Sequence, residues 1–125
     1  MKPKTTQHAE WTAPKPDIAK ISLNDKVGSE EALKTEFLGF VSHVINHGVR
    51  KVLVHNHELN HHISQGMQQW ALMNLELPLL QSGVDKIAMV MPNDESIMSL
   101  IPKSDTRRKR YFKTEQDALS WLESA

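Results

Sequence analysis

The chain of 125 residues contains no cysteine. Disulfide bonds, thiolate metal ligands and cysteine nucleophiles are therefore excluded, and no feature of the sequence indicates an oxidising compartment. No apolar run approaches the roughly 20 residues that cross a bilayer as a helix. The lysines near the N-terminus are not followed by the apolar segment of a signal peptide, so the sequence predicts a cytoplasmic protein.

The chain also lacks an excess of charge, because 15 Lys and Arg residues balance 15 Asp and Glu residues. A protein that binds nucleic acid usually carries a basic excess, so this balance argues against a nucleic-acid partner. Two catalytic signatures are missing as well: the GxSxG nucleophile elbow and a glycine-rich phosphate loop. We therefore expect a protein that is not an enzyme and that uses no cofactor.

Apolar residues recur in patterns that alternate between strands and helices. Alternation of apolar and polar residues predicts a strand over 18–23, and apolar runs predict strands over 51–54 and 86–91. We expect a last strand over 109–112. Helical spacing predicts a helix over 29–48 and a second helix that begins at residue 64 and is closed off by Pro78 and Gly83. It also predicts a short helix over 96–101 and a last helix that begins at residue 114. This order predicts an α/β domain over residues 18–125, with a mainly parallel sheet of four to five strands covered by about four helices.

Two other parts of the pattern lead to separate expectations. Residues 1–17 contain three prolines and many polar residues, which predicts a poorly ordered N-terminal arm with Trp11 as a candidate anchor. Met67, Trp70 and Trp121 lie on apolar stripes of the expected helices. We expect them to fill the core, with a pocket for an apolar ligand as the alternative.

Several short motifs occur in an order and at spacings that resemble a known family. They are the strand KVLV, Ile63-Ser64, Gln69-Trp70, the segment GVDKIA, Arg110-Tyr111-Phe112 and the closing ALSWL. Together they resemble the bacterial SpoIIAA-like proteins of the STAS superfamily, over roughly residues 18–125. The resemblance implies a STAS-type fold and a regulatory or protein-binding role. It also implies an alternative role, the binding of a small ligand or a lipid headgroup, and leaves a homodimer open.

This chain departs from the family pattern at two places. His55 and His57 stand where comparable members often have an acidic residue and an arginine. The regulatory members place a phosphorylated serine after an Asp-Ser pair, whereas Ser64 here follows Ile63. Ser64 is therefore either a helix N-cap, which we favour, or a phosphate-bearing position at a helix N-terminus.

The stretch HNHELNHH supplies the most conspicuous candidate site, made of His55, His57, Glu58, His61 and His62. Imidazole and carboxylate groups bind zinc or nickel, so a metal site is one interpretation. A polar loop after a strand end is the other. We favour it because a third ligand would have to fold back from a turn that no glycine enforces, and because adjacent histidines tend to point apart. We expect no structural metal, and we expect clustered histidines to make stability sensitive to acid.

A basic run near the C-terminus is the last candidate. Arg107, Arg108 and Arg110 could grip the phosphates of a nucleotide or a lipid headgroup. Such a run is more often a solvated approach to a strand. The sequence thus indicates a fold class more firmly than a function, with a protein, a small molecule or a lipid as the expected partner.

Overall fold

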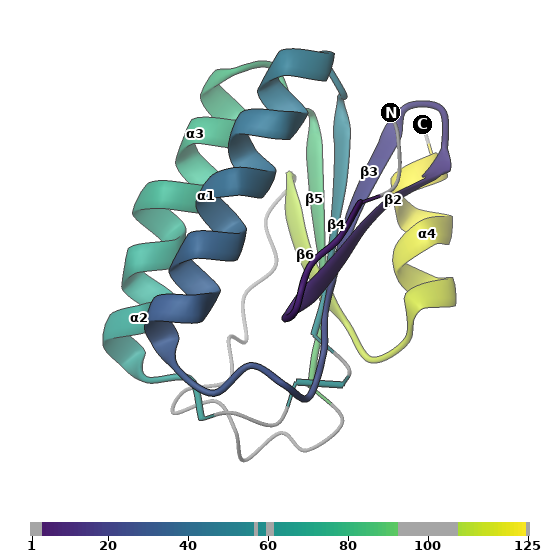
Figure 1. Cartoon of the computed structure of the whole chain (residues 1–125). Coiled ribbons are helices and arrows are strands. Elements are labelled where there is room, and N and C mark those ends of the chain that lie inside the picture. The colour runs from purple at the N-terminus through teal and green to yellow at the C-terminus, as the bar shows by residue number, and fades with distance from the viewer. Residues whose placement is uncertain (1–3, 57, 60–61, 93–107, 125) are drawn as a thin grey trace.

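A computed structural model describes residues 4–56, 58–59, 62–92 and 108–124. Six strands form one sheet in the order in which they follow along the chain (Figure 1). The strands are β1 (Lys4–Thr5), β2 (Ala9–Lys15), β3 (Ile18–Leu23), β4 (Lys51–His55), β5 (Lys86–Val90) and β6 (Lys109–Phe112). The first three strands pair antiparallel, and β3 to β6 pair parallel.

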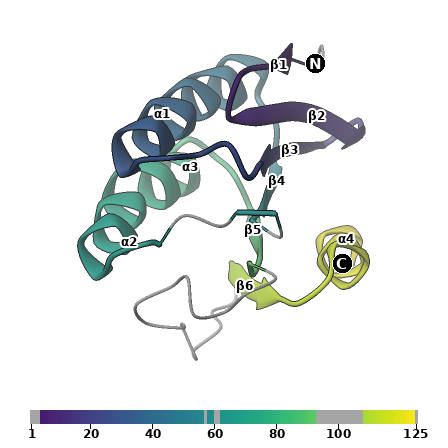
Figure 2. The same cartoon turned by 60° about the horizontal axis from the view of Figure 1, so that its bottom comes forward.

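Helices cover both faces of this sheet. Helix α1 (Glu30–His47) packs beside a second helical segment, which runs through α2 (Gln65–Ala71), the π-helical turn η1 (Leu72–Glu76) and α3 (Leu77–Gln81). Helix α4 (Glu115–Glu123) lies alone on the opposite face, as Figure 2 shows. The expected α/β class is therefore confirmed, with six described strands in place of four to five.

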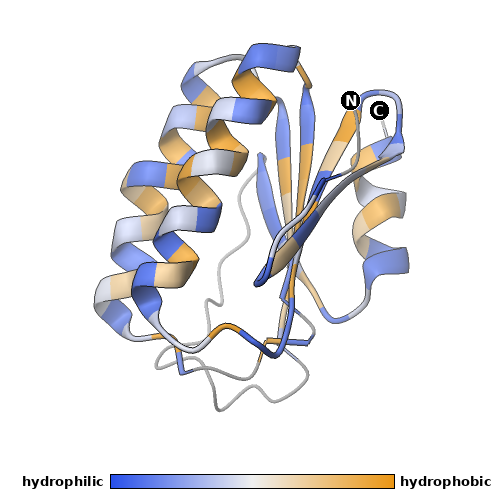
Figure 3. Cartoon of the chain, viewed as in Figure 1, coloured by the Kyte–Doolittle hydropathy of each residue, from blue (hydrophilic) through white to orange (hydrophobic). Residues whose placement is uncertain are grey.

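The sheet separates two apolar cores. The larger lies under α1 and the second helical segment and includes Phe40, Val54 and Leu75. The smaller lies under α4 and includes Leu53, Ala118 and Leu122. On the helices, the apolar residues lie on the side toward the sheet (Figure 3). Both faces of the sheet can be apolar because successive residues of a strand point to opposite faces.

The expectation of a poorly ordered arm over residues 1–17 is wrong for the segments that form β1 and β2. Trp11 is only 5% exposed and packs edge-on against Phe40, with ring centroids 6.0 Å apart. Pro14 disfavours a strand, but the register shifts between Thr12 and Lys15, and such an irregularity accommodates a residue without an N–H. Trp11 is thus an anchor, as expected, although it anchors a strand.

The helix boundaries agree with the sequence at most ends. Ser29 and Thr114 are the N-caps of α1 and α4, and Gly48 ends α1 in the left-handed conformation. Pro78 does not end its helix, which continues to Gln81 before Gly83. The helix expected over 96–101 lies outside the described residues. No helix in the described part of the chain is long and apolar enough to cross a membrane.

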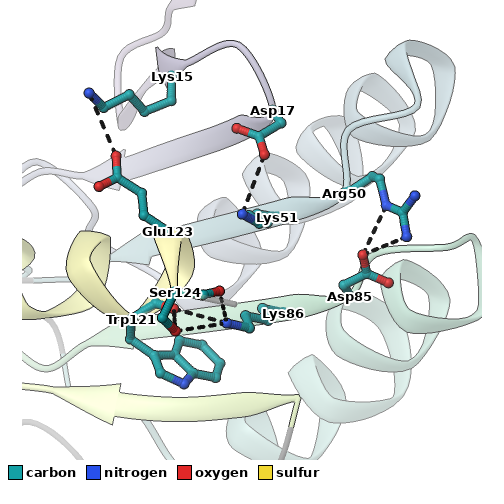
Figure 4. A network of polar contacts seen from close by, with 9 residues as sticks. All are labelled: Lys15, Asp17, Arg50, Lys51, Asp85, Lys86, Trp121, Glu123 and Ser124. Atoms are coloured by element: carbon teal, nitrogen blue, oxygen red, sulfur yellow. Dashed lines mark hydrogen bonds and ion pairs between the residues drawn. The ribbon is translucent and has the colours of Figure 1, made fainter.

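Polar contacts tie together the amino ends of the parallel strands (Figure 4). Lys86 donates to the backbone oxygens of Trp121 at 3.0 Å and Ser124 at 2.8 Å, which satisfies the carbonyl end of α4. Arg50 pairs with Asp85 at 2.7 Å, and Lys51 with Asp17 at 3.4 Å. These exposed pairs contribute little stability each. They show that this end of the sheet is closed by structural contacts.

Candidate functional site: a cavity beneath α2 and η1

The histidine-rich stretch begins, as expected, at the end of a strand. His55 is the last residue of β4, and its Nε2 atom lies 3.6 Å from Oε1 of Glu115. Glu115 also pairs with Lys20, so His55 belongs to a polar group facing the α4 side of the sheet. His57 and His61 lie outside the described residues.

The remaining candidates of this segment are spread over its surface and the next helix. Glu58 and His62 are exposed. Ser64 is an N-cap, since its Oγ accepts a hydrogen bond from the backbone N–H of Met67 at 3.0 Å. Its own N–H donates to the Glu30 carboxylate at 2.8 Å. In the regions that the structure describes, no three His, Asp or Glu side chains gather as a metal site would require.

The two described arginines of the basic run, Arg108 and Arg110, make contacts on different sides of the sheet. Arg108 donates to the backbone oxygen of Leu80 in α3 at 3.2 Å and to that of Val84, just after α3, at 2.7 Å. Arg110 lies over the ring of Trp121, on α4 and therefore on the opposite side of the sheet. Arg107 is outside the described residues. The two described arginines thus serve separate structural contacts.

A cavity of about 230 Å³ lies elsewhere, between the second helical segment and the carboxyl half of the parallel sheet. Its walls come from the ends of β3, β4 and β5, from β6, and from α1, α2 and η1. Most of the described lining is apolar, and the apolar side chains are Leu23, Leu33, Phe37, Leu59, Ile63, Met67, Ala71, Leu72, Leu75, Met89 and Pro92. Met67 therefore lines a pocket, which was the alternative to a purely core role.

An ion pair forms one polar wall of the cavity. Glu76 is 4% exposed and pairs with Lys109, the first residue of β6. Strand alternation puts Lys109 and Tyr111 on the same face, and the Lys109 ammonium lies 4.8 Å from the centre of the Tyr111 ring. Burial alone would lower the pKa of Lys109, but hydrogen bonding to Glu76 and Tyr111 outweighs burial and raises that pKa. Lys109 is therefore held as a cation.

The π-helical turn places Glu76 in this wall. The Leu77 N–H bonds to the Leu72 carbonyl, five residues back rather than four. Pro78 follows directly, and in a regular α-helix its ring would clash with the carbonyl of Asn74. The wider turn relieves that clash and buries Leu75 and Glu76 in succession. Such turns occur frequently at functional sites.

Two amide side chains of the lining carry buried atoms without hydrogen-bond partners in the described structure: Oδ1 of Asn56 and Nε2 of Gln68. Asn56 is 9% exposed, and its position is fixed by its backbone. Its N–H donates to the Val90 carbonyl at 3.1 Å, and its carbonyl accepts from Leu59 at 3.0 Å. A buried polar atom without a partner costs about 1–3 kcal/mol, so these two need an explanation.

Sequence reasoning did not bring together the polar residues of this cavity, which include Asn56, Gln68, Glu76, Lys109 and Tyr111. One signal was present. Glu76 is a single acidic residue in the apolar run LMNLELPLL, where an unpaired carboxylate would be costly to bury. Its partner follows 33 positions later in the sequence, and no local pattern connects them.

Comparisons of the chain with protein-family models, with curated proteins and with solved structures give no match. The α/β architecture and the cavity therefore rest on the structure alone. Membership of the STAS superfamily stays a prediction.

Proposed function

We propose that this domain binds a small molecule in the cavity beneath α2 and η1. The observation that carries the proposal is the cavity of about 230 Å³ itself, with apolar walls and a few buried polar groups. That combination is typical of ligand sites. An engineered apolar cavity of about 150 Å³ in another protein binds benzene, so a ring-sized ligand fits in this volume. The carboxyl ends of parallel strands are also where open α/β sheets commonly place their ligands.

The polar wall supports binding rather than catalysis. A lysine acts as a base or nucleophile when its pKa is depressed, whereas the pKa of Lys109 is raised. Its partner Glu76 is engaged as the counter-charge of that cation. We therefore propose a carrier or sensor of a small molecule, which agrees with the ligand-binding role that the STAS resemblance implies.

The first experiment is native mass spectrometry of the freshly purified protein, followed by titration of the ligand-free protein with toluene, monitored by NMR. We expect toluene to shift the resonances of residues that line the cavity. The variant Ala71→Leu extends a lining side chain into the cavity and should weaken binding at least tenfold. Ala32→Leu is the matched control, because Ala32 is a half-buried helix residue outside the lining.

Two results would contradict the proposal. One is the absence of any toluene-induced shift in the lining residues together with the absence of a co-purifying small molecule. The other is toluene binding of equal strength in the wild type and in Ala71→Leu, because the ligand would then lie outside the cavity.

A second candidate is the regulatory, protein-binding module that the STAS resemblance implies. Four large apolar side chains that are exposed on the helices support it: Leu38, Ile45, Leu72 and Met73. Exposed apolar side chains that gather on one surface are typical of protein-interaction sites. The test compares the proteins cross-linked to the wild type with those cross-linked to a Leu38→Glu/Met73→Glu variant. An identical set for both would contradict this candidate.

A further inference from the structure

The charges that line the cavity determine which ligands it can accept. Glu76 and Lys109 are the charged side chains in the described lining, and they neutralise each other. A carboxylate ligand would have to compete with Glu76 for Lys109 and would leave one carboxylate without a counter-charge. A cationic ligand would have to compete with Lys109 for Glu76 and would leave one cation without a counter-charge. Because an uncompensated buried charge costs several kcal/mol, the wall disfavours both.

The amide side chains define what a neutral ligand must offer. Asn56 brings an acceptor oxygen without a partner, and Gln68 brings a donor nitrogen without one, among the residues described. A ligand with both an N–H donor and a carbonyl acceptor can satisfy the two side chains. Each is an amide with a donor end and an acceptor end, so such a ligand also fits if either amide turns over.

From this combination, we infer that the cavity takes an uncharged, ring-sized molecule that carries a carboxamide-type group. The inference rests on the proposed function, since it names the ligand class of the same cavity. Apolar walls would hold the ring of the ligand. Its amide would compensate the buried polar atoms of Asn56 and Gln68, which the fold leaves without partners in the described structure.

Three probes with the same ring and different charge test the inference. They are benzamide, which is neutral, benzoate, which is an anion, and benzamidinium, which is a cation. Toluene is the fourth probe and lacks the polar group. At pH 7.5 we expect benzamide to bind the full-length protein at least tenfold more tightly than each of the other three, as measured by NMR titration.

The outcomes separate this inference from the proposed function. If neither toluene nor benzamide binds, the proposed function fails. If toluene binds and benzamide binds no more tightly, the cavity is a ligand site but the amide inference is overturned. Tighter binding of benzoate would also overturn it, because Lys109 would then act as the counter-charge of the ligand.

A variant pair tests the role of the amide side chain. Gln68→Met keeps the length of the side chain and removes its donor, so benzamide should lose its advantage over toluene while toluene still binds. Toluene binding also shows that the variant is folded. Gln81→Met is the matched control, since Gln81 is exposed in the same helical segment and outside the lining. An unchanged benzamide advantage in Gln68→Met would overturn the inference.

Discussion

Glu76 and Lys109 form an ion pair that joins the π-helical turn η1 to strand β6. The side chain of Glu76 is 5% exposed and that of Lys109 is 17% exposed. Both charges have therefore largely left water, and each depends on the other for compensation. The pair connects segments that lie 33 positions apart in the sequence, and it borders the cavity.

Removal of one partner should destabilise the domain. Lys109→Met and Glu76→Met each leave a buried charge without its partner, so we expect a loss of about 3–5 kcal/mol in the free energy of unfolding. The double variant leaves no charge and should recover much of this loss. Urea denaturation of the four proteins measures these values. Single variants that lose less than about 1 kcal/mol would show that water reaches the pair, as at exposed ion pairs.

The raised pKa of Lys109 leads to a prediction at alkaline pH. Its folded pKa lies above the ordinary value of 10.5. The corresponding stability is fully present below 10.5 and is lost as pH rises through the folded pKa. We therefore expect the difference in unfolding free energy between the wild type and Lys109→Met to narrow above pH 10.5. Tyr111 is present in both proteins, so its own contribution is the same in both and drops out of the difference. A constant difference up to the highest accessible pH would contradict the prediction.

The regular elements could be predicted because their signals are local. Strand β4 follows from its apolar run, and the N-caps Ser29 and Ser64 follow from their position before helical periodicity. Strand β2 was missed because Pro14 disfavours a strand locally, whereas the pairing with β3 and the burial of Trp11 override that preference. The cavity was missed for the same physical reason. Its polar wall joins Asn56, Glu76 and Lys109, which only the tertiary fold brings together.

His43, which lies outside the segment 55–62 in which we expected an effect of acid, has a lowered pKa. The expected effect of acid on the segment 55–62 stays a prediction. His43 lies on α1, with its ring 5.3 Å from Trp11 and 4.3 Å from His47. Burial lowers its pKa below the ordinary value of 6.5, and the charges of His47 and Lys4 lower it further. Its Nε2 is buried without a hydrogen-bond partner in the described structure.

The expected consequence is a loss of stability in acid. Since the folded pKa of His43 is below its unfolded value, the stability is fully present above 6.5 and is lost as pH falls from 6.5 toward the folded pKa. His43→Gln should lose less stability than the wild type between pH 7.5 and pH 5. His62→Gln is the control, because His62 is exposed. Thermal melts measure the difference, and equal acid sensitivity of the wild type and His43→Gln would contradict the prediction.

The last prediction concerns Trp11, which the sequence suggested as an anchor, and Trp121, which it assigned to the core. Trp11 is buried at 5% exposure, whereas Trp121 is only half-buried, with its ring against Lys86 of β5 and Arg110 of β6. Trp121 packs against the smaller core, as expected of a core residue, although it stays partly exposed. Trp11→Ala removes a ring from the larger core and should cost about 3–5 kcal/mol.

Trp121→Ala should cost roughly half as much, because the free energy scales with the apolar area removed from water. Both variants leave the cavity lining unchanged, so toluene binding at a temperature where they are folded should match the wild type. Urea denaturation measures the two costs side by side. A larger cost for Trp121→Ala than for Trp11→Ala would mean that α4 contributes more to stability than β2 does, and that the N-terminal strands are accessory to the sheet.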